Sequence, residues 1–395
     1  MKISVGVFFG GKSTEHEISC ISANQVLNAL DSDKYEVIPV YISKDNEFYL
    51  GDALFDIGNY SSIVKNPSSL LAKACLYKDA NKVIVKPVKG SLFKKEERTI
   101  DVAFPVVHGT NVEDGSLAGY LQMLDLPYTS CDVLGGALGQ DKDVMKDVFR
   151  SKGLPIVDYM TVFGSDFDER LEDYLIEARR IGFPLIAKPA NLGSSIGIEI
   201  IENEDEFADK VAECLKYDFK VVVEKMIADL MEVNIAVMGN DDEIMISAIE
   251  EVTNGFLDYD KKYCAGGKGS KGAKKVPAKG ASKGMASTNR KVPADLKDEQ
   301  RQLIEETAKE AYRYLNAYGC VRIDYMIDKK TDKVYINEIN TIPGSLSFYL
   351  WEATGISFSK ECDLLIRNAL KRYGMKEKKT YAFDTNILDG YRRKS

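Results

Sequence analysis

The fold of this chain is decided by residues 321–344, which read VRIDYMIDKKTDKVYINEINTIPG. Two short runs, 321–327 and 333–339, alternate polar and apolar side chains, and the polar residues 328–332 separate them. Alternation with a period of two is typical of half-buried strands, and a short polar link between two such runs indicates a turn. The segment therefore predicts a pair of neighbouring strands with one apolar face and one polar face.

The polar face of this strand pair carries the most specific chemistry in the sequence. Arg322 and Asp324 stand two residues apart on the first strand, so they share a face. Glu338 and Asn340 do the same on the second strand, and pairing of Asp324 with Glu338 would bring all four together. Three oxygen ligands beside an arginine suit Mg²⁺ bridging phosphates. A solvated polar sheet face is the alternative, but the apolar opposite face and the following Gly344 favour a functional site.

The N-terminal part of the chain predicts an α/β unit. Residues 2–9 form an apolar run that ends in two glycines, and a helix is expected over 19–30. Further strands are expected at 35–42 and 100–107. Because strands alternate with helical patterns, we predict a parallel sheet with crossover helices and place this unit at residues 1–139.

The remainder of the chain predicts a central unit at 140–228 and a C-terminal unit at 229–395. Helices are expected over 142–151 and 299–315. Residues 264–292 hold seven lysines, one arginine, six glycines and no acid, which predicts a basic mobile loop. Five short apolar runs predict further strands: 184–188, 197–201, 220–224, 232–237 and 243–249.

The composition excludes several classes of protein. The 395 residues are 45% hydrophobic and 29% charged, as in ordinary globular chains. The net charge of −8 argues against nucleic acid as a partner, and the lack of a run of about 18 apolar residues argues against a membrane span. We expect no signal peptide. Seven scattered cysteines without a CxxC pair indicate a reducing, cytoplasmic environment, and only two histidines are present.

One motif is misleading. Residues 6–13, GVFFGGKS, match the phosphate-binding pattern GxxxxGKS. That mechanism needs a loop between the glycines, whereas Val7, Phe8 and Phe9 belong inside a strand. We therefore interpret the match as accidental and do not expect a P-loop nucleotide hydrolase.

Three other positions are candidates for ligand contacts. Lys188 precedes the small-residue loop 190–197, which offers one cation with free amides and hydroxyls to a phosphate. Glu15 and His108 follow two of the predicted strands, at the sheet edge where α/β proteins bind ligands. For the loop after Lys188 the alternative is a plain hairpin turn. For Glu15 it is a solvated charge in the first turn of a helix, and for His108 it is a half-buried structural histidine.

Several segments, in this order along the chain, carry a family resemblance: FFGGKSTEHEIS, PVVHG, EDGSLAGYLQMLDLPYT, IAKPANLGSSIG, VVVEKMI, LDYDKKY, RIDYM and INEINTIPGS. They resemble the D-alanine–D-alanine ligases of the ATP-grasp superfamily. The resemblance implies an α/β chain with an N-terminal parallel-sheet, or pre-ATP-grasp, domain. An ATP-grasp fold of two α+β subdomains would follow it.

The resemblance also implies a role for each matched residue. ATP would lie between two antiparallel sheets, and two Mg²⁺ ions, with Mn²⁺ as an alternative, would bridge its phosphates. The ATP contacts implied are Lys142, Lys188, Ser195 and Lys262 near the phosphates, Glu224 and Ile227 at the adenine, and Glu232 at the ribose. The metal ligands implied are Asp324, Glu338 and Asn340.

For the amino-acid substrates, the resemblance places the ammonium of the first D-alanine on Glu15, with His108 nearby. Ser194 and Tyr263 would complete a network with Glu15, and Tyr263 would mark the start of the basic loop. Arg322 and the amide of Gly344 would stabilise the tetrahedral intermediate.

One departure from the family bears on the second substrate. Five residues after Gly344 the family has a serine, followed by a residue such as leucine, and this pair binds the carboxylate of the second amino acid. This chain has Tyr349 and Leu350 there. The tyrosine ring either fills the carboxylate's space or points away from it.

We expect an ATP-dependent ligase that joins D-alanine to D-alanine through a D-alanyl phosphate and supplies peptidoglycan precursors. A ligase with another second amine, D-serine or a small peptide, is the first alternative. A nucleotide-regulated protein whose basic loop binds an anionic partner is an alternative from another class. The resemblance further implies a cytoplasmic homodimer with small-molecule substrates.

Overall fold

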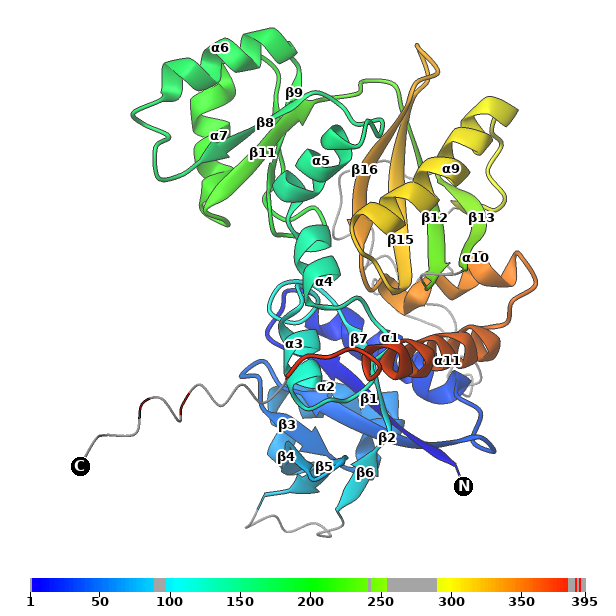
Figure 1. The fold of residues 1–395 in the computed structure, drawn as a ribbon. Helices are drawn as coiled ribbons and strands as arrows, with labels where there is room; N and C mark the ends of the chain where they lie inside the picture. Colours follow the sequence, from blue (N-terminus) through cyan, green and yellow to red (C-terminus); the bar gives the residue numbers. More distant parts are fainter. Residues whose placement is uncertain are drawn as a thin grey trace, which may run out of the picture.

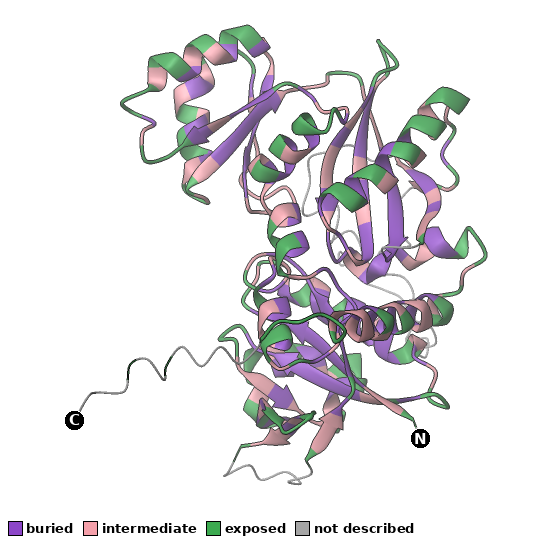
Figure 2. Cartoon of the chain, in the orientation of Figure 1, coloured by how far each residue is buried: buried purple, intermediate pink, exposed green. Residues whose placement is uncertain are grey.

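The computed structural model describes residues 2–88, 97–240, 243–253 and 290–382, together with Leu388 and Tyr391. Figure 1 shows three units, each built around one sheet. The N-terminal sheet lies at the bottom of the view, and the two other sheets stand side by side above it. In Figure 2 the strands are mostly buried and the outer faces of the helices are exposed.

The N-terminal unit is a seven-stranded mixed sheet in the order β6-β5-β4-β3-β2-β1-β7. Three of its strands are parallel, as the sequence predicts: β1 (Ile3–Gly10), β2 (Tyr35–Ile42) and β7 (Val102–Val107). An antiparallel extension of the sheet was not predicted from the sequence. It consists of β3 (Phe48–Leu50), β4 (Ala72–Asp79), β5 (Lys82–Pro87) and β6 (Arg98–Ile100).

The strand predicted over 100–107 is β7, with one correction: the chain breaks at Asp101, and Ile100 belongs to the separate strand β6. The Asp101 carboxylate accepts a hydrogen bond from the Ser4 amide at 2.8 Å, and the Asp101 amide donates to the Ser4 carbonyl at 2.9 Å. Consequently β6 pairs with β5, whereas β7 pairs with β1 at the opposite end of the strand order. Asp101 alone separates Ile100 of β6 from Val102 of β7, so the two end strands of this sheet come close to each other at that point.

Helices cover this sheet and connect it to the rest of the molecule. The C-terminal helix α11 (Phe358–Lys376) returns to the N-terminal unit, where Leu365 and Ile366 share a buried cluster with Val5 of β1. Figure 1 shows α11 lying beside α1. The other helices of this part are α1 (His16–Ala29), α2 (Tyr60–Lys65), α3 (Ser116–Met123) and α4 (Val133–Gln140).

The central unit is a four-stranded antiparallel sheet in the order β10-β9-β11-β8. Helix α5 (Lys142–Ser151) precedes it, as predicted, whereas the sequence analysis missed β8. The strands are β8 (Tyr159–Phe163), β9 (Leu185–Pro189), β10 (Glu199–Ile201) and β11 (Lys220–Lys225). Helices α6 (Leu171–Ile181) and α7 (Phe207–Leu215) share its buried apolar cluster.

The C-terminal unit is a five-stranded antiparallel sheet in the order β14-β13-β12-β15-β16. Asp324 pairs with Glu338 and Arg322 with Asn340, which confirms the predicted register of the last two strands. The strands are β12 (Leu230–Gly239), β13 (Ile244–Val252), β14 (Arg290–Lys291), β15 (Gly319–Asp328) and β16 (Val334–Asn340). Its helices are α9 (Asp298–Tyr314) and α10 (Phe348–Glu352).

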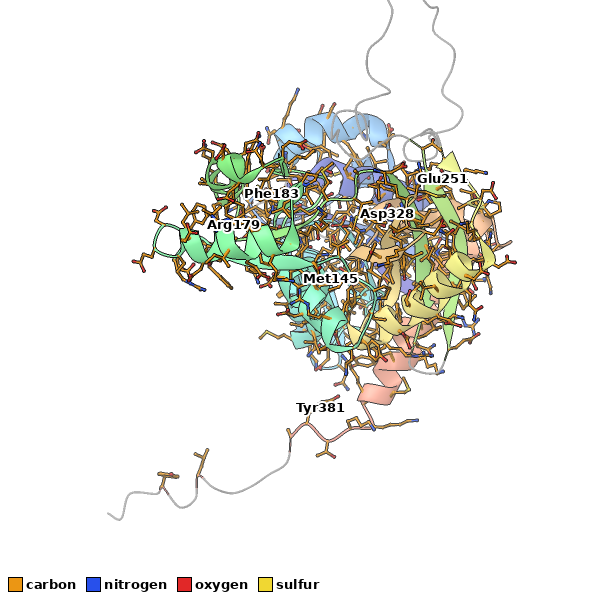
Figure 3. All side chains as sticks on the ribbon, turned by 90° about the horizontal axis from the view of Figure 1, so that it is seen from above. Met145, Arg179, Phe183, Glu251, Asp328 and Tyr381 are labelled. Atoms are coloured by element: carbon orange, nitrogen blue, oxygen red, sulfur yellow. The ribbon has the colours of Figure 1, made fainter. Side chains whose placement is uncertain are left out.

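The basic loop expected at 264–292 lies mostly outside the described residues. Its last residues are described and correct one boundary, because Arg290 and Lys291 form strand β14 and pair with β13. Figure 3 shows Arg179 of the central unit and Glu251 of β13 on opposite sides of the molecule, while Tyr381 stands away from its body. None of the described helices is long and apolar enough to cross a membrane.

Candidate active site

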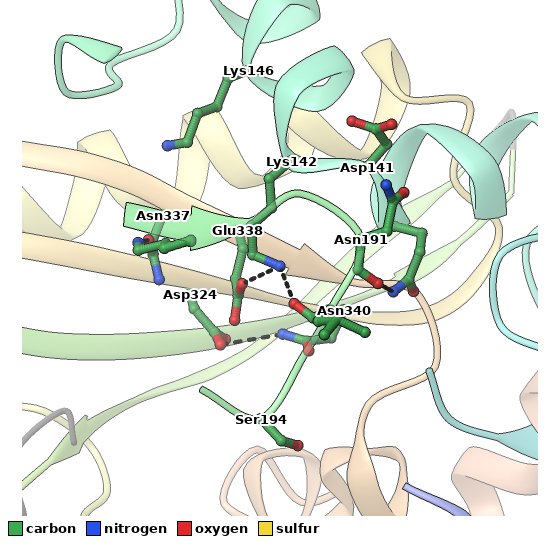
Figure 4. A network of polar contacts seen from close by, with 12 residues as sticks. Asp141, Lys142, Lys146, Asn191, Ser194, Asp324, Asn337, Glu338 and Asn340 are labelled. Carbon is green, nitrogen blue, oxygen red and sulfur yellow. Dashed lines mark hydrogen bonds and ion pairs between the residues drawn. The ribbon is translucent and has the colours of Figure 1, made fainter. Parts of the chain in front are cut away.

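The polar face of β15 and β16 holds the predicted metal ligands in one group. Arg322 makes a two-pronged ion pair with Asp324, with its Nε 2.6 Å from Oδ1 and its second nitrogen 2.7 Å from Oδ2. The Asn340 amide donates to Asp324 at 3.2 Å, and Glu338 is the cross-strand partner of Asp324 (Figure 4). Alternation on two paired strands accounts for this arrangement, because residues two apart point the same way.

The chemistry of this group fits a hard divalent cation. Two carboxylates and one amide oxygen are donors that Mg²⁺ accepts, and the ion usually completes its shell with water and phosphate oxygens. The described residues contain no cluster of three His, Cys, Asp or Glu side chains placed for a metal.

A lysine stands directly beside the carboxylates. The Lys142 ammonium donates to the Leu192 carbonyl at 2.7 Å and lies 3.4 Å from the Glu338 carboxylate (Figure 4). Lys142 begins α5, and its backbone amide donates to the Ala190 carbonyl at 2.9 Å. The central unit thus contributes a cation to the polar face of the C-terminal sheet.

A second lysine group lies deeper between the two sheets. Lys188 donates to the Asn337 side chain at 3.0 Å and forms an ion pair with Glu224. Lys146 also pairs with Glu224, at 2.8 Å. Burial alone would raise the pKa of Glu224, but the charges of Lys146 and Lys188 outweigh it and lower that pKa to about 2. The carboxylate of Glu224 is therefore held by two lysines.

Lys146 and Asn337 were not predicted from the sequence to lie in the site. Lys146 follows Lys142 by four residues, so the two lie on the same face of a helix that was itself predicted. That spacing is a signal that could have identified Lys146. Asn337 offered no such signal, because it precedes Glu338 and a regular strand would place it on the opposite face; the register of β15 with β16 shifts just there, after Asp324.

A cavity of about 400 Å³ lies beside these lysines. Glu224, Ile227 and Glu232, the three residues expected at the adenine and ribose, all line it, and so does Lys188. Its wall combines the segment that links β11 to β12 with side chains of β9, β13 and β15. The volume and the mixed apolar and polar lining suit a bound small molecule.

The loop between β9 and β10 brings the central unit to the N-terminal unit. The Ser194 hydroxyl donates to the Glu15 carboxylate, which precedes α1. Ser194 and Ser195 have φ angles of 54° and 59°, in the left-handed region that most residues avoid. The structure therefore brings together two of the three predicted network residues. The third, Tyr263, lies outside the described residues, as does Lys262.

His108 lies at the end of β7 and is fully engaged by the protein. Its Nδ1 donates to the Ile342 carbonyl at 2.8 Å, and its Nε2 is 3.0 Å from the Ser22 hydroxyl. Burial lowers the pKa of His108 despite the nearby charge of Glu15. These contacts match the structural alternative for this histidine, while its place near the substrate stays a prediction.

Glu113 lies near the candidate site and was not predicted from the sequence to belong to it. It accepts hydrogen bonds from the amides of Gly109, at 2.8 Å, and Ile342, at 2.7 Å, and from the Thr341 hydroxyl at 3.0 Å. Burial raises the pKa of Glu113 to about 7. The carboxylate thus ties the turn after β7 to the segment that leads into Gly344.

The turn after Gly344 is held in an uncommon conformation. Ser345, Leu346 and Ser347 have φ angles of 52°, 53° and 55°, although none of them is glycine. Three successive residues in the left-handed region cost free energy and persist only where the surroundings fix them. The Ser345 amide donates to the Ser22 hydroxyl at 2.9 Å, the same hydroxyl that meets His108.

Tyr349 points to the polar face of the C-terminal sheet. Its hydroxyl donates to Glu250 at 2.8 Å and accepts a hydrogen bond from Arg290. Asn234 donates to the same carboxylate oxygen at 3.0 Å, and Arg290 pairs with Glu250 at 2.7 Å. Leu350, by contrast, is buried in the apolar core, so only its backbone could meet a ligand. Glu250, Arg290 and Asn234 were not predicted from the sequence to lie in the site.

The Tyr349 cluster is continuous with the predicted metal site. Glu250 pairs across the strands with Asn234, Asn234 with Asp324, and Asp324 with Glu338. Cross-strand partners point to the same face of a sheet, so these four side chains form one polar row. The phenol of Tyr349 therefore stands on the same surface as the carboxylates.

The architecture is that of an ATP-grasp ligase. Two sheets face each other, the segment that links them lines a cavity, and a row of polar and charged side chains lies nearby on the C-terminal sheet. Two family models match, "D-ala D-ala ligase N-terminus" over residues 4–131 and "D-ala D-ala ligase C-terminus" over residues 148–367. The chain belongs to the D-alanine–D-alanine ligase family, which confirms the family and the fold class expected from the sequence.

Individual relatives agree with the family models. The chain is 37% identical over 390 residues to a D-alanine–D-alanine ligase of Thermosipho melanesiensis, with 98% of each chain covered. It is 36% identical to one of Geobacillus thermodenitrificans, with 97% of this chain and all of the relative covered. Among solved structures, the D-alanine–D-alanine ligase of Coxiella burnetii superposes with a TM-score of 0.76 at 29% identity over 95% of this chain and 96% of that one. A D-Ala:D-Ser ligase of Enterococcus faecalis superposes with a TM-score of 0.73 at 26% identity over 93% of this chain and all of that one.

Proposed function

We propose that this chain joins D-alanine to D-alanine, with ATP converted to ADP and phosphate. The observation that carries the proposal is the convergence of Lys142 with Glu338 and Asp324 beside the cavity, because phosphoryl transfer depends on positioned charge. The names of the relatives support the substrates. The carboxylate of the first D-alanine would attack the γ-phosphate and become an acyl phosphate. The amine of the second would then displace phosphate.

Six of the described residues have a proposed task in this reaction. Glu15, held by Ser194, would bind the ammonium of the first D-alanine, and Lys142 and Lys188 would bind phosphates. Arg322 and the Gly344 amide would stabilise the oxyanion of the tetrahedral intermediate. Lys262 and Tyr263 keep the roles that the family resemblance implies for them.

The metal site is proposed in the same way. Asp324, Glu338 and Asn340 would hold two Mg²⁺ ions, or Mn²⁺ in their place, and the ions would neutralise phosphate charge. Arg322 pairs with Asp324 in the protein alone, so metal binding would free its guanidinium for the reacting carboxyl group. A homodimer and a cytoplasmic location are proposed on the family resemblance alone.

A second candidate function has a specific observation in its favour. Where the family has a serine, Tyr349 joins Glu250 and Arg290 in a polar cluster on the substrate-facing side of the sheet. A different carboxylate-binding group favours a different second amine, such as D-serine or a small peptide. One structural neighbour is described as a D-Ala:D-Ser ligase.

The proposal is tested by incubating the purified protein with ATP, Mg²⁺ and a panel of D-amino acids. We expect ADP and phosphate to form only when an amino acid is present, and mass spectrometry to identify D-alanyl-D-alanine. Stoichiometric AMP would overturn the reaction class. A mixed dipeptide formed in preference to D-alanyl-D-alanine would select the second candidate.

A further inference from the structure

Glu113 is a half-buried carboxylate for which the proposed reaction gives no task. One of its oxygens accepts hydrogen bonds from the Ile342 amide at 2.7 Å and from the Thr341 hydroxyl at 3.0 Å. The other oxygen accepts from the Gly109 amide at 2.8 Å. Glu113 and Gly109 follow β7 of the N-terminal unit, whereas Thr341 and Ile342 follow β16 of the C-terminal unit. One carboxylate therefore bridges the two units.

Both backbone groups of Ile342 are held by the N-terminal unit. Its amide donates to Glu113, and its carbonyl accepts a hydrogen bond from His108 Nδ1 at 2.8 Å. The Ile342 side chain is buried in the same apolar cluster as side chains of β1 and β7. The path of the chain from Asn340, where β16 ends, to Gly344 is thus set by partners outside its own sheet.

Gly344 lies directly between two anchored points of the chain. Pro343 alone separates it from Ile342, and the Pro343 ring fixes one of the two backbone angles, so a shift of Ile342 is passed on to the Gly344 amide. On the other side, the Ser345 amide donates at 2.9 Å to a hydroxyl of α1. The amide that is proposed to stabilise the oxyanion is therefore positioned by contacts with the N-terminal unit.

The Gly109 end of the bridge lies against the proposed ammonium site. Gly109 has a φ angle of 81°, and a β-carbon at this position would lie 3.1 Å from a carboxylate oxygen of Glu15. The Gly109 backbone thus packs closely on Glu15 while its amide is held by Glu113. The ammonium nitrogen and the carboxyl carbon of an α-amino acid are two bonds apart. The groups that bind them must therefore keep a fixed separation.

We propose that Glu113 is a positioning residue for the Gly344 amide. By holding Ile342 and Gly109 with one carboxylate, it fixes that amide relative to Glu15. The amide then meets the oxyanion of an amino acid whose ammonium is bound by Glu15. This inference rests on the proposed function, because it assumes that Glu15 and Gly344 contact the substrate. The alternative is that Glu113 joins the two units for stability alone.

The test separates the two chemical steps in single-turnover experiments, with ADP and dipeptide measured in the same quenched samples. Glu113→Gln keeps the shape of the side chain but has one oxygen instead of two, so it cannot accept hydrogen bonds at both ends of the bridge. We expect ADP to form at nearly the wild-type rate and dipeptide to form about tenfold more slowly or worse, the worth of one hydrogen bond to a charged group. The KM for ATP should stay unchanged.

Two further variants accompany Glu113→Gln. The matched control is Asp114→Asn, because the Asp114 carboxylate also accepts from two backbone amides, those of Asn111 and Ser116, but within its own loop. Both steps should keep their wild-type rates in this control. Thr341→Val removes only the hydroxyl donor of the bridge, so it should slow dipeptide formation by a smaller factor. The thermal midpoint of each variant separates loss of folded protein from loss of rate.

The outcomes are distinguishable. A purely structural role for Glu113 predicts wild-type rates of both steps in the folded fraction of Glu113→Gln, and that result would overturn the inference. Equal slowing of ADP and dipeptide formation would also overturn it, because the Gly344 amide is proposed to act in the second step alone. Should Glu113→Gln fail to fold, unchanged rates in Thr341→Val decide against the inference. A wild type that forms no dipeptide would overturn the proposed function, and the inference with it.

Discussion

Replacing Tyr349 by phenylalanine isolates the hydroxyl that distinguishes this chain from its family. The hydroxyl donates to Glu250 at 2.8 Å and accepts a hydrogen bond from Arg290. The ring stays, because it packs on the Arg290 guanidinium at 4.7 Å and on Phe348 at 6.0 Å. Glu250 keeps Arg290 and Asn234 as partners. A hydrogen bond to a charged group contributes about 1.5–3 kcal/mol, and we expect a loss at the lower end of that range.

The stability assay is urea unfolding of Tyr349→Phe beside Tyr217→Phe, a control at a tyrosine that is 55% exposed. Burial raises the pKa of Tyr349 above its ordinary value, so the hydroxyl stays protonated and the loss should be the same from pH 6 to pH 9. A loss no larger than that of the control would refute the hydrogen-bonding role of the phenol.

Kinetics test whether the same hydroxyl serves the second substrate. Loss of one polar contact changes binding about tenfold, so Tyr349→Phe should alter the KM for the second amino acid and leave that for the first unchanged. Tyr349→Ser restores the family's residue but removes the ring, so we expect a larger shift in the second KM and a stability loss of about 3–5 kcal/mol. Equal shifts in both KM values would remove Tyr349 from the second-substrate site.

Three further predictions follow from the site. Glu338→Gln should abolish turnover without lowering the thermal midpoint, because the side chain is 27% exposed and its proposed role is to bind the metal; near-normal turnover at limiting Mg²⁺ would contradict the proposed site. The pKa of Glu113 rises on folding from 4.5 to about 7, so its stabilising contribution is complete below pH 4.5 and is lost as pH rises through 7. In the wild type, this group should lower the free energy of unfolding by up to about 3 kcal/mol between pH 4.5 and pH 8. Glu113→Gln should remove that decrease, and an unchanged pH dependence in the variant would contradict the raised pKa. Shortening 264–289 should leave the thermal midpoint nearly unchanged, since halving a loop alters its closure free energy by only about 0.6 kcal/mol, but should raise the KM for ATP; normal ligation would favour a role in binding a partner.

The features predicted correctly from the sequence are strands whose polar and apolar side chains alternate, or whose side chains form a short apolar run. The alternation in 321–327 and 333–339 predicted β15 and β16, and their pairing brought Asp324 opposite Glu338. The buried run at Val7 to Phe9 excluded a phosphate loop there, and all three side chains are buried in β1. Side-chain direction in a strand follows from position alone, so such inferences need no knowledge of the neighbours.

The antiparallel strands β3 to β6 show where periodicity stops being informative. β3 and β6 are each three residues long, too short for a distinctive alternation. The break at Asp101 depends on a contact with Ser4, almost a hundred residues away. Neither feature leaves a local signal, because each is stabilised by partners that only the folded chain supplies.

The sequence by itself determined the family, the strand pair of the proposed metal site and the group of oxygen donors upon it. The tertiary structure decided which buried charges meet. Glu224 is shared by Lys146 and Lys188 from a helix and a neighbouring strand, and Tyr349 reaches Glu250 from a helix that follows the sheet. Burial makes such pairings strong, yet burial is created by packing between elements that are distant in sequence, so no local pattern encodes it.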